Sequence, residues 1–178
     1  YIAMTERMDK TVGDLLKVLA DEGLADRTLI LFVSDNGPSY LAGTTGGLRG
    51  GKHSLWEGGI RVAAVARWPA RIQAGAVTDQ PATVLDVFPT FLALAGLEPE
   101  AGVTLDGIDI GPLLFQGKSL PERPLCWRYL KSVAVRDGKW KLVGKYDPEM
   151  RQAELAGKYG GLFDLEADPA EEHDLAAE

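Results

Sequence analysis

The chain has 178 residues, 46% of them hydrophobic and 25% charged, with a formal net charge of -7 at pH 7. This composition is typical of a globular protein that can bury a core, and the length fits one large or two small domains. The acidic balance argues against a nucleic-acid-binding surface, so an anionic ligand must be attracted by a local cluster of positive groups. No stretch is apolar enough to span a membrane, and a single cysteine excludes an intrachain disulfide.

The first part of the chain carries a helix pattern followed by a strand pattern. Apolar side chains recur at three- and four-residue steps from Met4 to Ala20, which predicts an amphipathic helix that Gly23 ends in a left-handed conformation. Thr28–Val33 is a short apolar run of the kind that is buried on both faces in a parallel sheet. The helical pattern starts at Tyr1 without a lead-in, so we expect further sequence to precede it.

A long loop and a second strand and helix follow. Pro38–Gly59 is rich in glycine and has no clear period, and loops of this length in compact domains tend to be functional. Arg61–Trp68 is a further strand pattern, and Asp86 is placed to cap a helix that runs to Leu94 and ends at Gly96. Strands that alternate with helices predict an α/β fold with a parallel sheet.

The amino-acid composition changes after residue 96, which indicates a second domain. Residues 97–124 are rich in Gly and Pro and predict a traverse between domains. The short strand patterns that follow are Leu125–Leu130, Ser132–Arg136, Lys139–Val143 and Leu162–Leu165, with a hairpin turn at Asp137-Gly138. Asp168 and Glu171 then have the spacing of a capping box at the start of a terminal helix. We predict an α/β domain over residues 1–100 and a small antiparallel sheet-and-helix domain over 101–178.

Two oxygen-bearing side chains stand where the strand Thr28–Val33 ends. In open α/β sheets, ligands bind at the carboxyl ends of the strands, and Asp35 and Asn36 occupy such an end. A carboxylate beside an amide oxygen suits Ca²⁺ or Mg²⁺. Asp-Asn-Gly is also a common turn sequence, so this motif alone leaves a metal site and a plain turn open.

A second candidate stretch is the glycine-rich run from Gly46 to Val62. Its glycines allow a close approach to a ligand, and Lys52 is a point charge suited to an oxyanion. Gly46 to Lys52 matches the start of a phosphate-binding P-loop, but His53 stands where Ser or Thr should follow, and Gly58-Gly59 interrupts the expected helix. A flexible loop with a solvated lysine therefore stays an alternative, and His53 is either a substrate contact or a plain loop residue.

Four further polar or titratable residues receive structural interpretations. Glu57 and Arg61 lie four residues apart and predict a structural ion pair. Cys126 falls in a strand pattern, where a buried apolar role is expected. His173 lies among acidic residues and is expected to be solvated.

Five segments, taken together and in order, resemble the C-terminal part of the type I sulfatases. They are TLILFVSDNG, LRGGKHSLWEGGIRV with the following RWP, LDVFPTFLALAG, DGIDIGPLL and the closing GLFDLEADPAEEHDL. The resemblance covers nearly the whole chain. It implies the C-terminal part of an alkaline-phosphatase-like, doubly wound α/β sheet, followed by a small antiparallel domain. It also implies hydrolysis of sulfate esters around a divalent cation, usually calcium, or else magnesium.

The resemblance also implies roles for individual residues. Asp35 and Asn36 match metal ligands of the family, and Lys52 matches the lysine that contacts the sulfate group. The family's nucleophile is a formylglycine made from the first residue of a Cys/Ser-x-Pro/Ala-x-Arg motif. Cys126 does not fit that motif, because Arg128 and Leu130 stand at the Pro/Ala and Arg positions. We therefore expect the nucleophile and the remaining metal ligands to precede Tyr1, and we expect the isolated fragment to be inactive.

Two other functions remain open at this point. One is a phosphate or phosphonate ester hydrolase of the same superfamily, although such enzymes use several histidines and this chain has two. The other is a non-catalytic module that binds sulfated ligands through Lys52 and Arg49. Expected partners are a sulfate ester or sulfated glycan, together with the missing N-terminal portion or a second copy of the chain. The family implies a periplasmic, secreted or lysosomal location.

Overall fold

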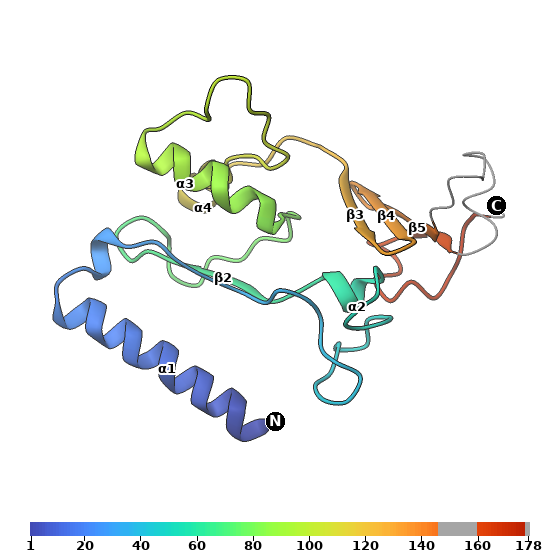
Figure 1. Cartoon of the computed structure of the whole chain (residues 1–178), viewed down its shortest axis with the longest axis horizontal. Helices are drawn as coiled ribbons and strands as arrows, with labels where there is room; N and C mark the ends of the chain where they lie inside the picture. Colours follow the sequence, from blue (N-terminus) through green and yellow to red (C-terminus); the bar gives the residue numbers. More distant parts are fainter. Residues whose placement is uncertain (146–159, 177–178) are drawn as a thin grey trace. The chain divides into compact units, whose positions relative to one another are not determined.

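A computed structural model describes residues 1–145 and 160–176 (Figure 1). The chain contains two compact units: Tyr1–Phe32 with Val65–Pro121, and Val33–Ala64 with Glu122–Glu178. These units interleave along the sequence, whereas the two predicted domains are consecutive, and the division near residue 100 stays a prediction. No helix in the described part of the chain is long and apolar enough to cross a membrane.

The first unit contains the predicted N-terminal helix and strands. Its elements are α1 (Ile2–Asp21), η1 (Ala25–Arg27), β1 (Ile30–Val33), β2 (Ala64–Arg67), η2 (Val84–Asp86), α3 (Val87–Ala95) and α4 (Gly111–Gln116). Helix α1 ends before Gly23, which has the expected positive φ of 66°. Strands β1 and β2 pair in a two-stranded sheet. The helix and both strands are confirmed, with strands shorter than predicted.

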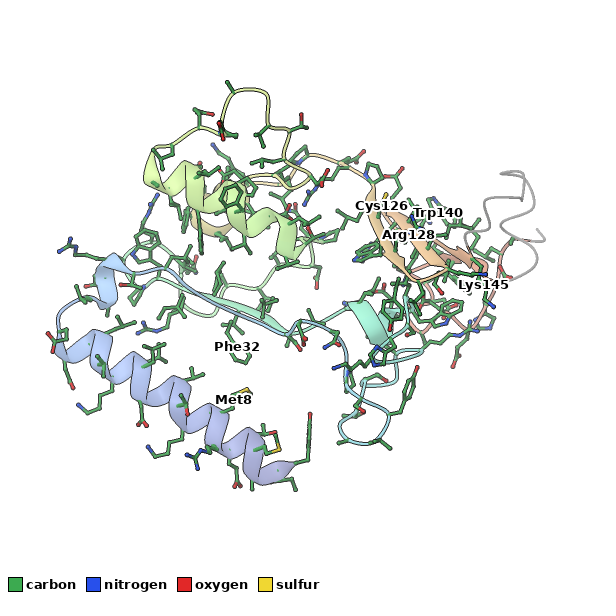
Figure 2. The ribbon with its side chains drawn as sticks, viewed as in Figure 1. Met8, Phe32, Cys126, Arg128, Trp140 and Lys145 are labelled. Carbon is green, nitrogen blue, oxygen red and sulfur yellow. The ribbon has the colours of Figure 1, made fainter. Side chains whose placement is uncertain are left out.

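The apolar side chains of α1 and β1 are more exposed than the sequence pattern predicts. Helix α1 has no buried residue, and Met8 remains 49% exposed. Phe32, which the strand pattern placed in a sheet buried on both faces, is 39% exposed. Figure 2 shows these two side chains pointing toward one another from their elements. The prediction of a fully buried strand is wrong for this chain, because within the described residues β1 pairs with β2 in a two-stranded sheet.

Helix α3 is tied to the segment that precedes α4. Asp86 stands at its N-cap, as predicted, but its carboxylate accepts hydrogen bonds from the backbone N–H groups of Thr83 (2.8 Å) and Ile108 (2.9 Å) instead of capping the helix. Thr90 Oγ1 accepts a bond from Ile110 N at 2.9 Å. Helix α4 itself was missed in the predicted traverse, where a proline in its first turn and the left-handed Gly117 were available signals.

The second unit is built on an antiparallel sheet of order β3-β4-β5-β6. Its strands are β3 (Leu125–Tyr129), β4 (Ser132–Asp137), β5 (Trp140–Lys145) and β6 (Gly161–Asp164), and its short helix is α2 (Glu57–Ile60). Leu55 packs in a buried cluster with Ala134 and Val143 of the sheet. The predicted strands and the hairpin turn, with Gly138 at φ 55°, are confirmed. Cys126 of β3 is exposed, so its predicted burial is wrong (Figure 2).

The predicted terminal helix is wrong over the described residues 165–176, which form turns. Asp168 does accept a bond from the N–H of His173 (2.8 Å), but Glu171 has a φ of 58°, which no right-handed helix contains. The cause is the buried position of the Glu171 side chain, which reaches partners in the sheet and in the loop before α2. His173 is 80% exposed, as expected.

Candidate functional site

The two candidate motifs lie side by side through backbone contacts within the second unit. Gly37, after the strand end, donates its N–H to the carbonyl of Gly59 at 2.9 Å. One residue further, the carbonyl of Pro38 accepts the N–H of Lys52 at 2.9 Å. The strand end and the glycine-rich loop are therefore parts of one local structure, although the bonded residues lie 14 and 22 positions apart along the chain.

The close approach of these motifs depends on glycine. A Cβ on Gly37 would lie 1.8 Å from the carbonyl oxygen of Gly58, far inside van der Waals contact. Both residues are buried, so the neighbouring backbone has no open space into which it can retreat. A side chain at Gly37 would push the strand end away from the loop.

Gly37→Ala is therefore expected to destabilise the protein by about 1–3 kcal/mol through overpacking. Gly13→Ala is the matched control, because Gly13 lies in α1 with nothing within 4 Å of its added Cβ. This control should stabilise the helix by roughly 0.5–1 kcal/mol. Urea denaturation of both variants measures the difference, and equal free energies of unfolding would show that the close approach carries no cost.

Asp35 and Asn36 offer two neighbouring hard oxygen ligands. Asp35 is exposed, and Asn36 Nδ2 donates a hydrogen bond of 2.5 Å to Asp35 Oδ1, which keeps the two side chains together. The carboxylate and amide fit a calcium or magnesium ion as part of a ligand set. Among the described residues, no group of three or more His, Cys, Asp or Glu side chains could hold a metal. Calcium takes six to eight oxygen ligands, so these two residues can supply only a part of such a site.

Lys52 and His53 lie at the turn of the glycine-rich loop, which is ordered by internal hydrogen bonds. Ser54 Oγ donates to the carbonyl of Gly51 at 2.8 Å, and its N–H bonds the same carbonyl. His53 has a φ of 74°, and its Nδ1 lies 3.1 Å from the hydroxyl of Tyr129 on β3. The two rings stack with centroids 5.7 Å apart. Tyr129 was not singled out from the sequence, and no signal there connects it to His53.

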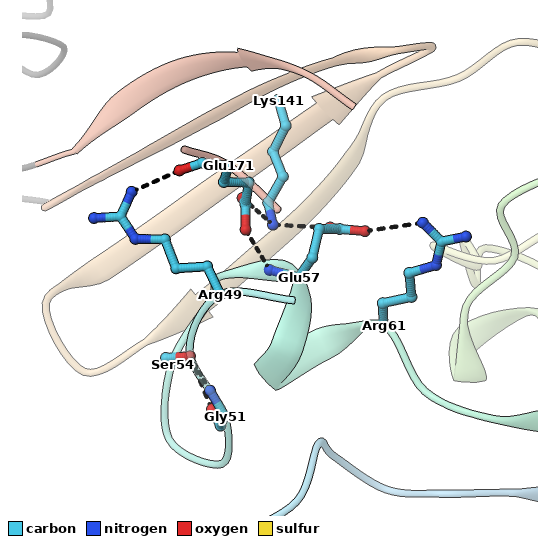
Figure 3. Close-up of polar contacts among 7 residues, drawn as sticks. All are labelled: Arg49, Gly51, Ser54, Glu57, Arg61, Lys141 and Glu171. Atoms are coloured by element: carbon cyan, nitrogen blue, oxygen red, sulfur yellow. Dashed lines mark hydrogen bonds and ion pairs between the residues drawn. The ribbon is translucent and has the colours of Figure 1, made fainter. Parts of the chain in front are cut away.

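A buried ionic cluster lies behind this loop (Figure 3). The Lys141 ammonium, which is fully buried, lies 2.9 Å from Glu57 Oε1 and 2.8 Å from Glu171 Oε1. The predicted pair of Glu57 with Arg61 exists, but at 3.9 Å it is the longer contact. The main partner, Lys141, was not predicted. It lies two positions before the buried Val143 in β5, and side chains two positions apart in a strand point to the same face of the sheet, here the buried one.

Burial and charge act in opposite directions on Glu171. Burial raises the pKa of its carboxyl group, and the hydrogen bonds from Lys141 and from the N–H of Glu57 lower it in part. Two carboxylates share one ammonium here, so the cluster carries an excess negative charge when both are ionised.

Arg49, which with Lys52 was the candidate pair for binding a sulfated ligand without catalysis, already has partners within the protein. Its guanidinium lies 3.7 Å from the centre of the Trp56 ring and donates a hydrogen bond to the Glu171 carbonyl.

Comparison with known proteins gives consistent matches along the chain. The Sulfatase family model matches residues 1–97. Arylsulfatase A of Homo sapiens is 37% identical over 190 residues, which cover 94% of this chain and 37% of that protein. Steryl-sulfatase of Mus musculus is 34% identical over 211 residues, covering 100% and 34% of the two chains. The crystal structure of Ps i-CgsB in complex with k-i-k-neocarrahexaose has a TM-score of 0.81 and 33% identity, covering 95% of this chain and 37% of that one. The chain thus spans about a third of the length of these relatives.

Proposed function

This chain belongs to the sulfatase family, and from that premise we propose that it is part of an enzyme that hydrolyses sulfate esters with the help of a divalent cation. The observation that carries the proposal is the contact between the Asp-Asn strand end and the Lys52 loop. Gly37 bonds Gly59 and Pro38 bonds Lys52, so two motifs with complementary chemistry lie in one place.

We assign Asp35 and Asn36 as ligands of the cation, and we propose calcium, or else magnesium. Their neighbouring oxygens, on an exposed Asp35 and a half-buried Asn36, suit either ion, and the neutral amide limits the negative charge near an anionic substrate. When bound, the cation would polarise the sulfate group as a Lewis acid. Asp35 and Asn36 would orient it at the end of β1.

Lys52 is the proposed catalytic contact to the sulfate group. Its ammonium would stabilise the negative charge that develops on the sulfuryl oxygens and the departing ester oxygen. Its backbone is fixed by the bond to Pro38, at the apex of a loop with defined internal hydrogen bonds. His53 is proposed as a further substrate contact, since Nδ1 lies against Tyr129 and leaves Nε2 available.

The nucleophile is proposed to come from outside these 178 residues. A formylglycine, formed from a Cys or Ser, would supply the attacking hydroxyl group. Cys126 and its neighbours do not form the required motif. Ser119-Leu120-Pro121-Glu122-Arg123 has the residue pattern of the motif, but it follows the Lys52 loop in the sequence, whereas the family resemblance places the nucleophile before Tyr1. The relatives are roughly three times as long as this chain. The exposed apolar side chains of α1 and β1 support a neighbouring polypeptide segment, from the same protein or a second copy, as the partner.

The substrate class is a sulfate ester, from a small molecule to a sulfated glycan. The names of the relatives point to aryl and steryl sulfates, and the solved relative binds an oligosaccharide, so the choice of ester stays open between them. A periplasmic, secreted or lysosomal location remains a proposal from the family. The non-catalytic sulfate-binding alternative is less well supported, because Arg49 is held by Trp56 and Glu171.

The 178-residue chain by itself is expected to show no turnover of an aryl sulfate with added calcium. The residue proposed to become the formylglycine lies outside these 178 residues, so the covalent step is not expected to begin. The complete protein that carries this chain, assayed in parallel with the same substrate, should hydrolyse the ester. Turnover by the pure chain would contradict the assigned nucleophile, and an inactive complete protein across several sulfate esters would contradict the proposed function.

Asp35→Ala in the complete protein is expected to weaken calcium binding at least about tenfold, because a charged ligand is lost from the site. Competition with a calcium-chelating dye measures the affinity directly and does not depend on activity. Asp79→Ala is the control, since Asp79 is an exposed aspartate distant in sequence from the motif. Equal affinities for the two variants would remove Asp35 from the metal site.

A further inference from the structure

The loop that carries Lys52 and His53 is held at both of its ends by a single residue near the end of the chain. At the first end, Arg49 Nη1 donates to the backbone carbonyl of Glu171 at 2.9 Å. At the second end, the N–H of Glu57 donates to the Glu171 carboxylate, at 2.6 Å from Oε2. Figure 3 shows both bonds meeting at Glu171, one from Arg49 and one from Glu57.

The two ends of the loop are also bound to each other, so Glu171 completes a closed ring of contacts. Gly58 donates its N–H to the carbonyl of Arg49 at 2.7 Å. The Arg49 guanidinium lies over the ring of Trp56, with 3.7 Å from its central carbon to the ring centroid. Movement of either end therefore breaks a contact at Glu171 as well as one inside the loop.

Glu171 takes up this position at a cost in backbone conformation and in burial. Its φ of 58° lies in the left-handed region, which residues other than glycine rarely occupy, and its side chain is fully buried. Such conformations persist when the surrounding contacts over-determine them. Lys141 contributes the compensating charge, since its ammonium lies between the carboxylates of Glu57 and Glu171.

We propose that Glu171 is a positioning residue, which fixes the loop Arg49–Glu57 and through it sets the place of Lys52 at the sulfate group. The proposal rests on the function proposed above for Lys52. It assigns a role in the reaction to Glu171, which lies 119 positions after Lys52 in the sequence. In this proposal Glu171 contacts neither the substrate nor the divalent cation. Lys141 supports it, since its ammonium lies 2.8 Å from Glu171 Oε1 and offsets part of the rise that burial causes in the pKa of that carboxyl group.

Hydrogen exchange tests the structural half of the proposal without any assay of activity. Glu171→Ala should increase the exchange rates of the loop amides 50–57 at least about tenfold, while Glu171→Gln, which keeps an acceptor, restores most of the protection. Glu172→Ala, the exposed neighbour, should leave them unchanged. The amides of β4 and β5 report global unfolding. If Glu171→Ala unfolds the sheet as well, Arg49→Gln, which removes the bond to the Glu171 carbonyl together with the stacking on Trp56, should still loosen the loop. Unchanged loop exchange in Arg49→Gln and Glu171→Ala would overturn the proposal.

A double-mutant cycle tests the functional half in the complete protein, with an aryl sulfate as substrate. If Glu171 acts through Lys52, Glu171→Ala should lower kcat about tenfold with Lys52 present and less than twofold in the Lys52→Ala background. Equal factors in both backgrounds would show a loss of folded protein and overturn the positioning role. If the complete protein hydrolyses no sulfate ester, the proposed function fails, and the exchange experiment alone decides whether Glu171 holds the loop.

Discussion

Lys52→Ala in the complete protein is expected to lower the turnover of sulfate esters about 100-fold or more, by analogy with the loss of one preorganised oxyanion donor. The expected loss is in kcat more than in KM, because the charge on the sulfuryl and leaving oxygens increases toward the transition state. The position of Lys52 supports this, since its N–H donates to the carbonyl of Pro38, which follows the proposed metal ligands Asp35 and Asn36.

The matched control for this variant is Lys131→Ala. Lys131 is an exposed lysine in the turn between β3 and β4 of the same unit, so it removes one positive charge without touching the loop. Steady-state kinetics with an aryl sulfate should give near-normal kcat for the control. A near-normal kcat for Lys52→Ala would remove Lys52 from the site and leave the loop as a structural feature only.

Local sequence patterns predict most of the secondary structure of this chain, because the signals lie within single elements. The helix from Ile2 to Asp21 and the hairpin around Gly138 follow from periodicity and turn chemistry. The α/β class is shared with the solved sulfatase structure, which confirms the expected alkaline-phosphatase-like fold. The terminal helix was wrong because Glu171 satisfies distant partners, and no local pattern reports a contact between residues 114 positions apart.

Some residues of the candidate site could be predicted from the local sequence, whereas others reach it only through tertiary contacts. Asp35, Asn36 and Lys52 were selected from residue chemistry and from the family resemblance, and the structure bonds the backbone of Lys52 to Pro38, two positions after Asn36. Tyr129 and Glu171 were not selected, since each reaches the site by a tertiary contact from the antiparallel sheet or the segment after it. The sequence therefore indicates residues with a chemical role, whereas those that support them become visible only in the fold.

Lys141→Met is expected to have the largest effect on stability, a loss of about 3–5 kcal/mol, because it leaves two buried carboxylates without their cation. Without Lys141, the pKa of Glu171 rises further above its already raised value, so the folded state binds a proton that the unfolded state releases. Stability is then lost as the pH rises above about 4.5, the ordinary value for glutamate, and the deficit against the wild type should be larger at pH 8 than at pH 5.

Chemical denaturation followed by tryptophan fluorescence measures this effect, since Trp56 and Trp127 pack against the core beside the cluster. Lys131→Met, in the exposed turn, should change the free energy of unfolding by no more than about 0.5 kcal/mol. Adding Glu57→Gln and Glu171→Gln to Lys141→Met removes the uncompensated charges and should recover part of the loss, with most of the pH dependence abolished. A Lys141→Met variant within about 1 kcal/mol of the wild type at pH 8 would show that the cluster does not hold the loop against the sheet. In that case the positioning of Lys52 would have to come from the backbone bonds of the loop and from the hydrophobic contacts of Leu55 and Trp56.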